Sequence, residues 1–324
     1  MSNLSDKTLV SYKSTINSIH KQIGLGPVAP NDSASWIEKN LSAVMKMINE
    51  TESKHTAKNR VVILKIWADM FNLPDKVIGV LDKKMYELVD EVNGSYQTNK
   101  MNDKVAENWQ SIDQIRERVE VLKNKLPEPK YIDTYKEYIQ LMRYLCLLFH
   151  TYLPLRNDLA DARLMEKMPN DDDVDGNSNY IIINRKSNKG QLHLLAYKTR
   201  KEYGSKILDI PNDVVREITK YWDVIKHFSY DKDAWFIIKD GVGAPISRVS
   251  YTKMLNSAFA GEGIKVSSTQ IRRAVVTDLY APTEDEYKKK TELANVMGHS
   301  IETAGLMYAK VVPSTKKKNG DLGK

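Results

Sequence analysis

The spacing of apolar residues changes twice along the chain, and this change limits the folds that the chain can adopt. In the first half, apolar residues recur every three or four positions, as in amphipathic helices. The clearest stripes are Leu9, Tyr12, Ile16 and Ile19; Trp36, Leu41, Val44 and Ile48; Val61, Leu64, Ala68 and Phe71; and Ile112, Ile115, Val119 and Leu122. Three short apolar runs follow and predict strands at residues 180–184, 192–195 and 206–210, with turns at 188–190 and 198–204. Helical spacing then returns, so we expect a mainly α protein with a small antiparallel β-sheet, in the α+β class.

A polar stretch indicates where the chain divides. At 324 residues the chain is longer than a typical single domain, which favours two domains. Residues 93–103 are rich in Asn, Gly, Ser and Thr, a composition typical of linkers. We therefore predict a helical domain at residues 1–95, a linker at 96–110 and a second domain at 111–324.

The composition is that of an ordinary soluble protein. Hydrophobic residues make up 41% of the chain and charged residues 28%, and the formal net charge is +7. This positive charge suits a polyanionic partner but does not by itself identify one. The single cysteine, Cys146, lies in the apolar run 144–149, which is too short to span a membrane and indicates a buried helix. The first residues lack the layout of a secretory signal, so we expect an intracellular protein that is neither secreted nor membrane-bound.

The sequence offers no pattern for a metal or a nucleotide cofactor. Its six histidines are scattered, and neither an H-E-x-x-H motif nor a cysteine cluster is present. Gly241–Gly243 lacks the further glycine and lysine of a phosphate-binding loop and indicates a turn. We expect neither metal nor cofactor.

Five groups of residues are suited to attack on a phosphodiester. A Gly298–His299 pair is followed by Tyr308, nine positions past the histidine, and Arg272, Arg156 and Lys198 lie upstream. A tyrosine can form a covalent phosphodiester, and arginines can present paired donors to phosphate oxygens. Lysine or histidine can supply a proton to the leaving oxygen. A free phenol titrates near ~10, so attack at neutral pH needs cations around it.

Four segments resemble the motifs of the tyrosine recombinase family, the class that includes phage-type integrases. Residues 269–279 (TQIRRAVVTDL) are similar to the box H-x-L-R-H-x-x-x-T-x-L. Residues 293–300 (LANVMGHS) with Tyr308 are similar to the L-G-H-S box and its tyrosine. Residues 153–159 (LPLRNDL) resemble the first-arginine motif, and residues 197–199 (YKT) resemble the β-hairpin lysine.

The resemblance implies a role for each residue. Tyr308 would attack the scissile phosphate and form a 3′-phosphotyrosyl link, while Arg156 and Arg272 hold the phosphate. Lys198 would protonate the leaving 5′-oxygen, and His299 would hydrogen-bond the phosphate and assist the tyrosine.

The resemblance also implies partners and an architecture. A helical core-binding domain and a catalytic domain would clamp double-stranded DNA, and four protomers would exchange strands between two DNA sites. An accessory DNA-bending protein could take part. Such enzymes serve viruses, phages and other mobile elements in site-specific recombination or DNA integration.

Two departures from the family pattern matter most. Thr269 stands where the family usually has histidine or lysine, and it brings no charge, although Arg273 could compensate. After Arg156 the acid comes two residues later, as Asp158, where the family more often has glutamate three residues later.

Other interpretations of these residues remain open. Taken singly, Lys198 could be a solvated lysine in competition with Lys201 and Lys206, and Tyr308 could be a core residue like other tyrosines of the chain. A type IB topoisomerase would use the same chemistry as a monomer to relax supercoils. A relative that binds DNA but has lost cleavage is the third alternative, and Thr269 is its best argument.

Overall fold

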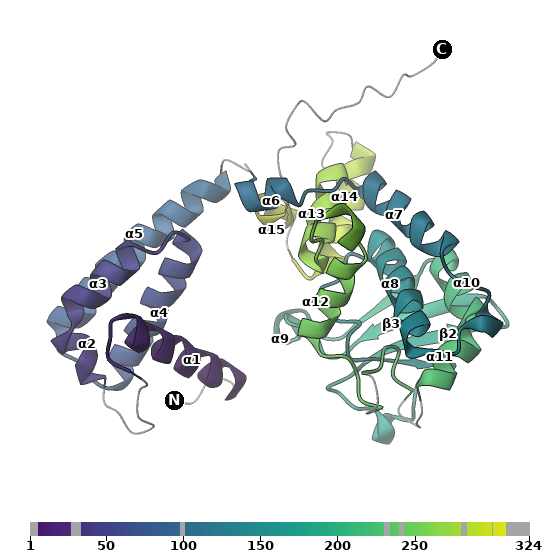
Figure 1. Ribbon diagram of the computed structural model, residues 1–324, viewed down its shortest axis with the longest axis horizontal. Helices are drawn as coiled ribbons and strands as arrows, with labels where there is room; N and C mark the ends of the chain where they lie inside the picture. Colours follow the sequence, from purple (N-terminus) through teal and green to yellow (C-terminus); the bar gives the residue numbers. More distant parts are fainter. Residues whose placement is uncertain are drawn as a thin grey trace, which may run out of the picture. The chain divides into compact units, whose positions relative to one another are not determined.

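The computed structural model describes residues 6–26, 34–97, 101–229, 234–239, 243–279, 284–299 and 301–308. By its internal contacts the chain divides into two compact units, Met1–Thr98 and Asn99–Lys324. Figure 1 shows the elements of each unit, coloured along the sequence. Within the described residues, no helix is both long enough and apolar enough to cross a membrane.

The first unit is built from helices in the residues that the structure describes. They are α1 (Asp6–Gln22), α2 (Ser35–Lys39), α3 (Leu41–Asn49), α4 (Lys54–Met70) and α5 (Asp75–Gln97). Helix α4 begins at a Ser53 cap, whose hydroxyl accepts a hydrogen bond from the Thr56 amide at 3.3 Å. Its apolar stripe is buried and packs against α5 and α1. The three predicted stripes of this unit are confirmed as core faces, except that Phe71, at the end of the third, is exposed.

The second unit combines helices with a small sheet. Its helices are α6 (Asp103–Glu107), α7 (Ile112–Asn124), α8 (Tyr135–Tyr152), α9 (Arg200–Tyr203), α10 (Asn212–Lys220), α11 (Trp222–Phe228), α12 (Arg248–Ser257), α13 (Ser268–Leu279), α14 (Glu284–Met297) and α15 (Ile301–Met307). Short 3-10 turns are η1 (Pro129–Tyr131), η2 (Asp171–Asp173) and η3 (Ala260–Glu262). Helix α6 lies inside the range 96–110 that we assigned to a linker.

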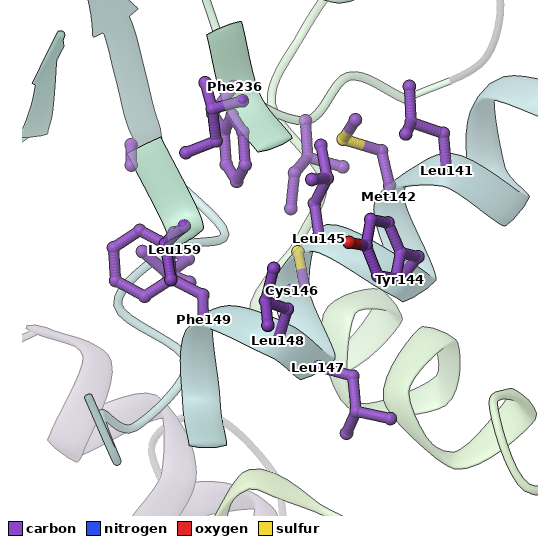
Figure 2. Close-up of a cluster of buried hydrophobic side chains, with 14 of the residues drawn as sticks. Leu141, Met142, Tyr144, Leu145, Cys146, Leu147, Leu148, Phe149, Leu159 and Phe236 are labelled. Atoms are coloured by element: carbon purple, nitrogen blue, oxygen red, sulfur yellow. The ribbon is translucent and has the colours of Figure 1, made fainter. Parts of the chain in front are cut away.

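Helix α8 is the centre of the second unit. A capping box starts it: Thr134 accepts from the Glu137 amide, and the Glu137 carboxylate accepts from the Thr134 amide. Its second half is buried all around, since α7, α10, α11, α12 and α13 pack on it. Figure 2 shows this cluster, with Cys146 among leucines and Phe149. Cys146 is fully buried and its pKa is raised to about 12 by burial, which confirms it as a core residue.

The described strands form one sheet in the order β1-β2-β3-β4. They are β1 (Ala162–Met165), β2 (Asn179–Asn184), β3 (Lys189–Leu194) and β4 (Lys206–Ile210). The pairs β2–β3 and β3–β4 are antiparallel, which confirms the three predicted strands. The expectation of a purely antiparallel sheet is wrong, because β1 pairs with β2 in parallel. Strand β1 is only four residues long, too short for a recognisable alternation, and it was missed for that reason.

The loops around β3 also differ in detail from the prediction. Strand β3 begins at Lys189, three residues before the predicted start, and pairs Gly190 with Ile183. A Cβ atom at position 190 would lie 2.7 Å from Cδ1 of Ile183 and 2.9 Å from Cγ2 of Val215. Helix α10 and the sheet approach each other closely here, which explains a glycine inside the strand. The segment 198–204 contains helix α9 and is more than a simple turn.

Candidate functional site

Arg156 lies in the segment that follows α8. The helix ends at Tyr152, ahead of Pro154, and the leucines on both sides of that proline are buried. This packing anchors the chain just before Arg156, which is itself half-buried. The Nη2 atom of Arg156 lies 2.6 Å from Nε2 of His299.

Arg272 is a buried cation on helix α13. Its side chain is only 2% exposed, and its Nη1 atom donates to the carbonyl oxygen of Pro154 at 3.0 Å. In the described part of the chain, its Nε and Nη2 atoms have no hydrogen-bond partner in good geometry, although the Tyr308 side chain is near enough to raise the pKa of Arg272 against the effect of burial. Burial lowers the pKa of Arg272, but a guanidinium titrates so high that it stays charged. A buried charge with unused donors is costly unless an anion compensates it, so this position is suited to a phosphate.

His299 is held by the cap at the end of α14. The His299 amide donates to the carbonyl of Ala294 at 3.0 Å, and the Gly298 amide donates to the carbonyl of Asn295 at 3.1 Å. These bonds form a Schellman motif, with Gly298 in the left-handed region at φ 67°. The Gly-His pair is therefore a helix cap that turns the imidazole out of the helix, towards Arg156 and Tyr308.

The His299 imidazole is neutral at physiological pH. Burial is the largest cause, and together with the charges of Arg156, Arg272, Lys198 and Lys206 it lowers the pKa of His299 to about 4. The guanidinium of Arg156 can only donate hydrogen bonds, so Nε2 of His299 must act as the acceptor. The imidazole proton is therefore on Nδ1.

Tyr308 follows helix α15 and faces the same cluster. Its hydroxyl lies 3.1 Å from Nε2 of His299, and the centre of its ring lies 5.0 Å from Cζ of Arg272. A small apolar cluster of Val276, Met297 and Ala304 packs against Tyr308 and ties α13, α14 and α15 together. Tyr308 is half-buried, so part of its side chain remains accessible to solvent.

Two lysines lie near this cluster: Lys198 in the β3–β4 loop and Lys206 at the start of β4. Lys198 is exposed and near enough for its charge to lower the pKa of His299. Lys206 is half-buried, and its ammonium donates to the carbonyl oxygen of Asn295 in the last turn of α14. Lys201, the other lysine of the β3–β4 loop, is exposed on α9.

The remaining predicted residues lie on α13. Thr269 is exposed in the first turn, and Arg273 is half-buried, next to Arg272. Neighbouring positions on a helix differ by about 100° in direction, so Arg273 faces a different side from Arg272.

Several supporting residues were not found from the sequence. Asn179 is fully buried at the start of β2: its amide donates to the carbonyls of Asp158 and Ala196, and its side-chain oxygen accepts from the amides of Leu195 and Ala196. It therefore fixes the Arg156 segment relative to the loop that carries Lys198. A buried strand asparagine has no sequence signal that separates it from a turn-forming one.

Two further contacts join the Arg156 segment to α12 and α13. Asn157 accepts from the Ser268 hydroxyl at 2.8 Å and donates to the hydroxyl of Thr252 at 2.8 Å. Asp158 is buried and accepts from the Arg156 amide at 3.2 Å. Burial raises the pKa of Asp158, while the charges of Arg248, Arg156 and Arg272 oppose that rise. The acid two residues after Arg156 thus lies among the cations of the site.

The arrangement combines a tyrosine hydroxyl with converging cations. Tyr308, His299, Arg156 and Arg272 meet through the contacts given above, and Lys198 adds its charge from the β3–β4 loop. Such a cluster can bind a phosphate and present a phenol to it. Among the described residues, no group of three or more His, Cys, Asp and Glu side chains is arranged to hold a metal ion.

No protein-family model matches the chain, and no curated protein matches it. Among solved structures, a crystal structure of XerA recombinase is similar, with a TM-score of 0.42 and 14% identity, covering 96% of this chain and 89% of that chain. This likeness is too low to support an argument about function.

Proposed function

We propose that this chain is a DNA strand transferase of the tyrosine class, which cuts and rejoins duplex DNA as a site-specific recombinase or integrase. The observation that carries the proposal is Arg272: a buried guanidinium whose Nε and Nη2 atoms have no well-aligned acceptor among the described residues, beside the ring of a half-buried tyrosine. A bound phosphate would supply the missing acceptors. The net charge of +7 agrees with a nucleic-acid partner.

The reaction would exchange one phosphodiester for another. The Tyr308 oxygen attacks phosphorus, a P–O bond to the tyrosine forms, and the bond from phosphorus to the 5′-oxygen breaks. The phenol proton leaves by way of Nε2 of His299, and Lys198 gives a proton to the 5′-oxygen. Attack of a 5′-hydroxyl on the phosphotyrosine reverses these steps and rejoins the strand.

Phosphate binding would also prepare His299 for its role. Arg156 and the Tyr308 hydroxyl both lie within hydrogen-bond distance of Nε2, which has one lone pair. A phosphate oxygen would replace Nε2 as the acceptor for Arg156. The lone pair of His299 would then be available to the phenol alone.

Recombination, as opposed to simple relaxation, would require four protomers on two DNA sites. We propose this assembly for the chain, with a role in the movement of a mobile element. Affinity would come mainly from phosphate contacts and would fall with salt. Relaxation of plasmids by the monomer, with no pairing of sites, would favour a type IB topoisomerase instead.

The test is detection of a covalent protein–DNA adduct on denaturing gels. Nicked duplexes tiled across the DNA that flanks the gene serve as substrates, and Tyr308→Phe is the matched variant. The wild type is expected to form an adduct, and Tyr308→Phe is expected to bind the same DNA without forming one. Adducts with Tyr308→Phe would exclude this tyrosine as the nucleophile. Clear binding without any wild-type adduct would favour a DNA-binding relative that has lost cleavage, with Thr269→His as the first variant to restore it.

A further inference from the structure

The end of α14 is held from outside the helix by a lysine of the sheet. Lys206 is the first residue of β4 and pairs with Leu194 of β3, so its backbone is part of the sheet. Its ammonium donates to the carbonyl oxygen of Asn295. That oxygen also accepts from the Gly298 amide within the helix cap. A cation is favourable here, because the last carbonyls of a helix carry partial negative charge.

The Lys206 ammonium also lies near two aromatic rings. The Lys206 ammonium lies 5.0 Å from the ring centre of Tyr203 and 6.0 Å from that of Tyr197. The Tyr197 hydroxyl donates to the carbonyl of Gly204 at 2.6 Å, which joins the two ends of the segment that precedes Lys206. Burial lowers the pKa of Lys206, as expected for an ammonium partly removed from water.

The loop and the helix end are also in direct contact. A Cβ atom built on Gly298 would lie 2.7 Å from Oγ1 of Thr199, 3.6 Å from the ring of Tyr197 and 3.9 Å from Nζ of Lys206. There is no room for a side chain at position 298. The residue before His299 is therefore pressed against the loop that carries Lys198.

We propose that Lys206 is a positioning residue: its bond to Asn295 holds the end of α14 against the β3–β4 loop and so fixes His299 where it meets Arg156 and Tyr308. This inference rests on the proposed function for its catalytic consequence. The positioning of His299 by Lys206 does not depend on that function. Lys198, exposed on the β3–β4 loop, would reach the phosphate, while Lys206 holds that loop and the end of α14 in a fixed relative position.

The first measurement is the pKa of His299 in the free, full-length protein, by NMR of isotope-labelled histidine. The charged and titratable groups that face this ring are Arg156, Arg272, Lys198, Lys206 and Tyr308. The signal is assigned by its loss in His299→Gln. The wild type is expected to titrate far below 6.5. In Lys206→Met the pKa should rise by about one unit or more, because the ring leaves the other cations as well as losing Lys206. Lys198→Met is the matched control, since it removes a charge but not the bond, and its rise should be clearly smaller.

The second measurement is the rate of adduct formation on a nicked duplex. Lys206→Met is expected to be slower by on the order of 100-fold, because small displacements of a catalytic group cost that much. Its DNA affinity should be little changed. Lys206→Arg should recover most of the rate, since it keeps a cation and a donor. A variant that only lost stability would show a lower melting temperature, and Lys206→Gln, which keeps a donor without the charge, replaces Lys206→Met if the latter does not fold.

Each outcome decides the proposal. Wild-type values of both the His299 pKa and the rate in Lys206→Met would overturn it, as would equal pKa changes in Lys206→Met and Lys198→Met. If the wild type forms no adduct at all, the proposed function fails. The NMR titration still decides whether Lys206 positions His299.

Discussion

The Nη2 atom of Arg156 lies 2.6 Å from Nε2 of His299, and the two residues are 143 positions apart in the chain. The contact joins the segment after α8 to the end of α14. It also determines the protonation of the imidazole, because a guanidinium has no acceptor and Nε2 must therefore carry a lone pair. The same nitrogen faces the Tyr308 hydroxyl at 3.1 Å.

The rate of adduct formation should not show a histidine inflection near pH 6.5. Burial and four neighbouring cations lower the pKa of His299 to about 4, so the ring stays neutral from roughly pH 5 upwards. Single-turnover adduct formation between pH 5.5 and 8 measures this, with circular dichroism to confirm folding at each pH. His299→Gln should be slower by roughly 100-fold, the usual contribution of a positioned acid or base. A loss of rate below pH 6.5 that disappears in His299→Gln would contradict the neutral imidazole.

Arg272→Lys should reduce adduct formation by about 100-fold to 1,000-fold, as the loss of a transition-state donor does elsewhere. Lysine keeps the charge, but it lacks the planar set of N–H donors with which a guanidinium can hydrogen-bond the Pro154 carbonyl and a phosphate at the same time. Arg273→Lys, one position along α13, should have a smaller effect, because that side chain faces another side of the helix. Equal losses in the two variants would show that we chose the wrong arginine.

Gly298→Ala should destabilise the second unit and impair cleavage. The left-handed φ of 67° costs an ordinary residue about 1–2 kcal/mol, and the new Cβ would lie 2.7 Å from Oγ1 of Thr199. Thr199→Ala removes that contact and leaves the backbone strain. The double variant should therefore be more stable than the sum of the two single changes predicts. Urea unfolding of all three variants measures this coupling, and strict additivity would show that the loop can move away from the helix end.

Stability should fall as the pH falls below 6.5, because of His150. This residue is fully buried, and burial lowers its pKa to about 3. Between pH 6.5 and about 3 the unfolded chain binds a proton at this position and the folded chain does not. Each such group therefore costs about 1.4 kcal/mol of stability per pH unit over that window. His299 acts in the same direction down to about 4.

Urea unfolding of the full chain at pH 7.5 and 5.5 measures the effect. His150→Gln should show a shallower dependence on pH than the wild type, even if its stability at pH 7.5 is lower. The same dependence in both proteins would mean that His150 is protonated in the folded state or does not contribute.

Much of the fold was predictable because its signals are local. The stripe of α4 and the buried run of α8 follow from apolar spacing, and the three strands of β2, β3 and β4 follow from short apolar runs between turns. Strand β1 was missed because four residues carry too little pattern, and its parallel pairing depends on a partner 17 positions away at Asn179. Helix α9 was missed because a single turn inside a polar loop has no periodicity.

The candidate site, like the fold, was predictable only in part from the sequence. The order of Arg156, Lys198, Arg272, His299 and Tyr308 was visible in the sequence, and their catalytic roles stay predictions. The supporting contacts were not visible. The side chain of Asn179 joins the segments of Asp158 and Ala196. In the sequence, Asn179 is a single polar residue beside an apolar run, and its partners are known only once the sheet and the segment after α8 are folded together.

The sequence by itself determined the local geometry of the site: Gly298 can adopt the left-handed turn that ends α14, and it is followed directly by the histidine. Only the tertiary structure decided the chemistry of those side chains. The burial of Arg272, the lone pair that His299 turns to Arg156, and the choice between Lys198 and Lys206 each depend on segments far apart in the chain. The physical reason is that helix and turn preferences act over a few neighbouring residues. Desolvation and charge act through space, on whatever the packed fold brings within reach.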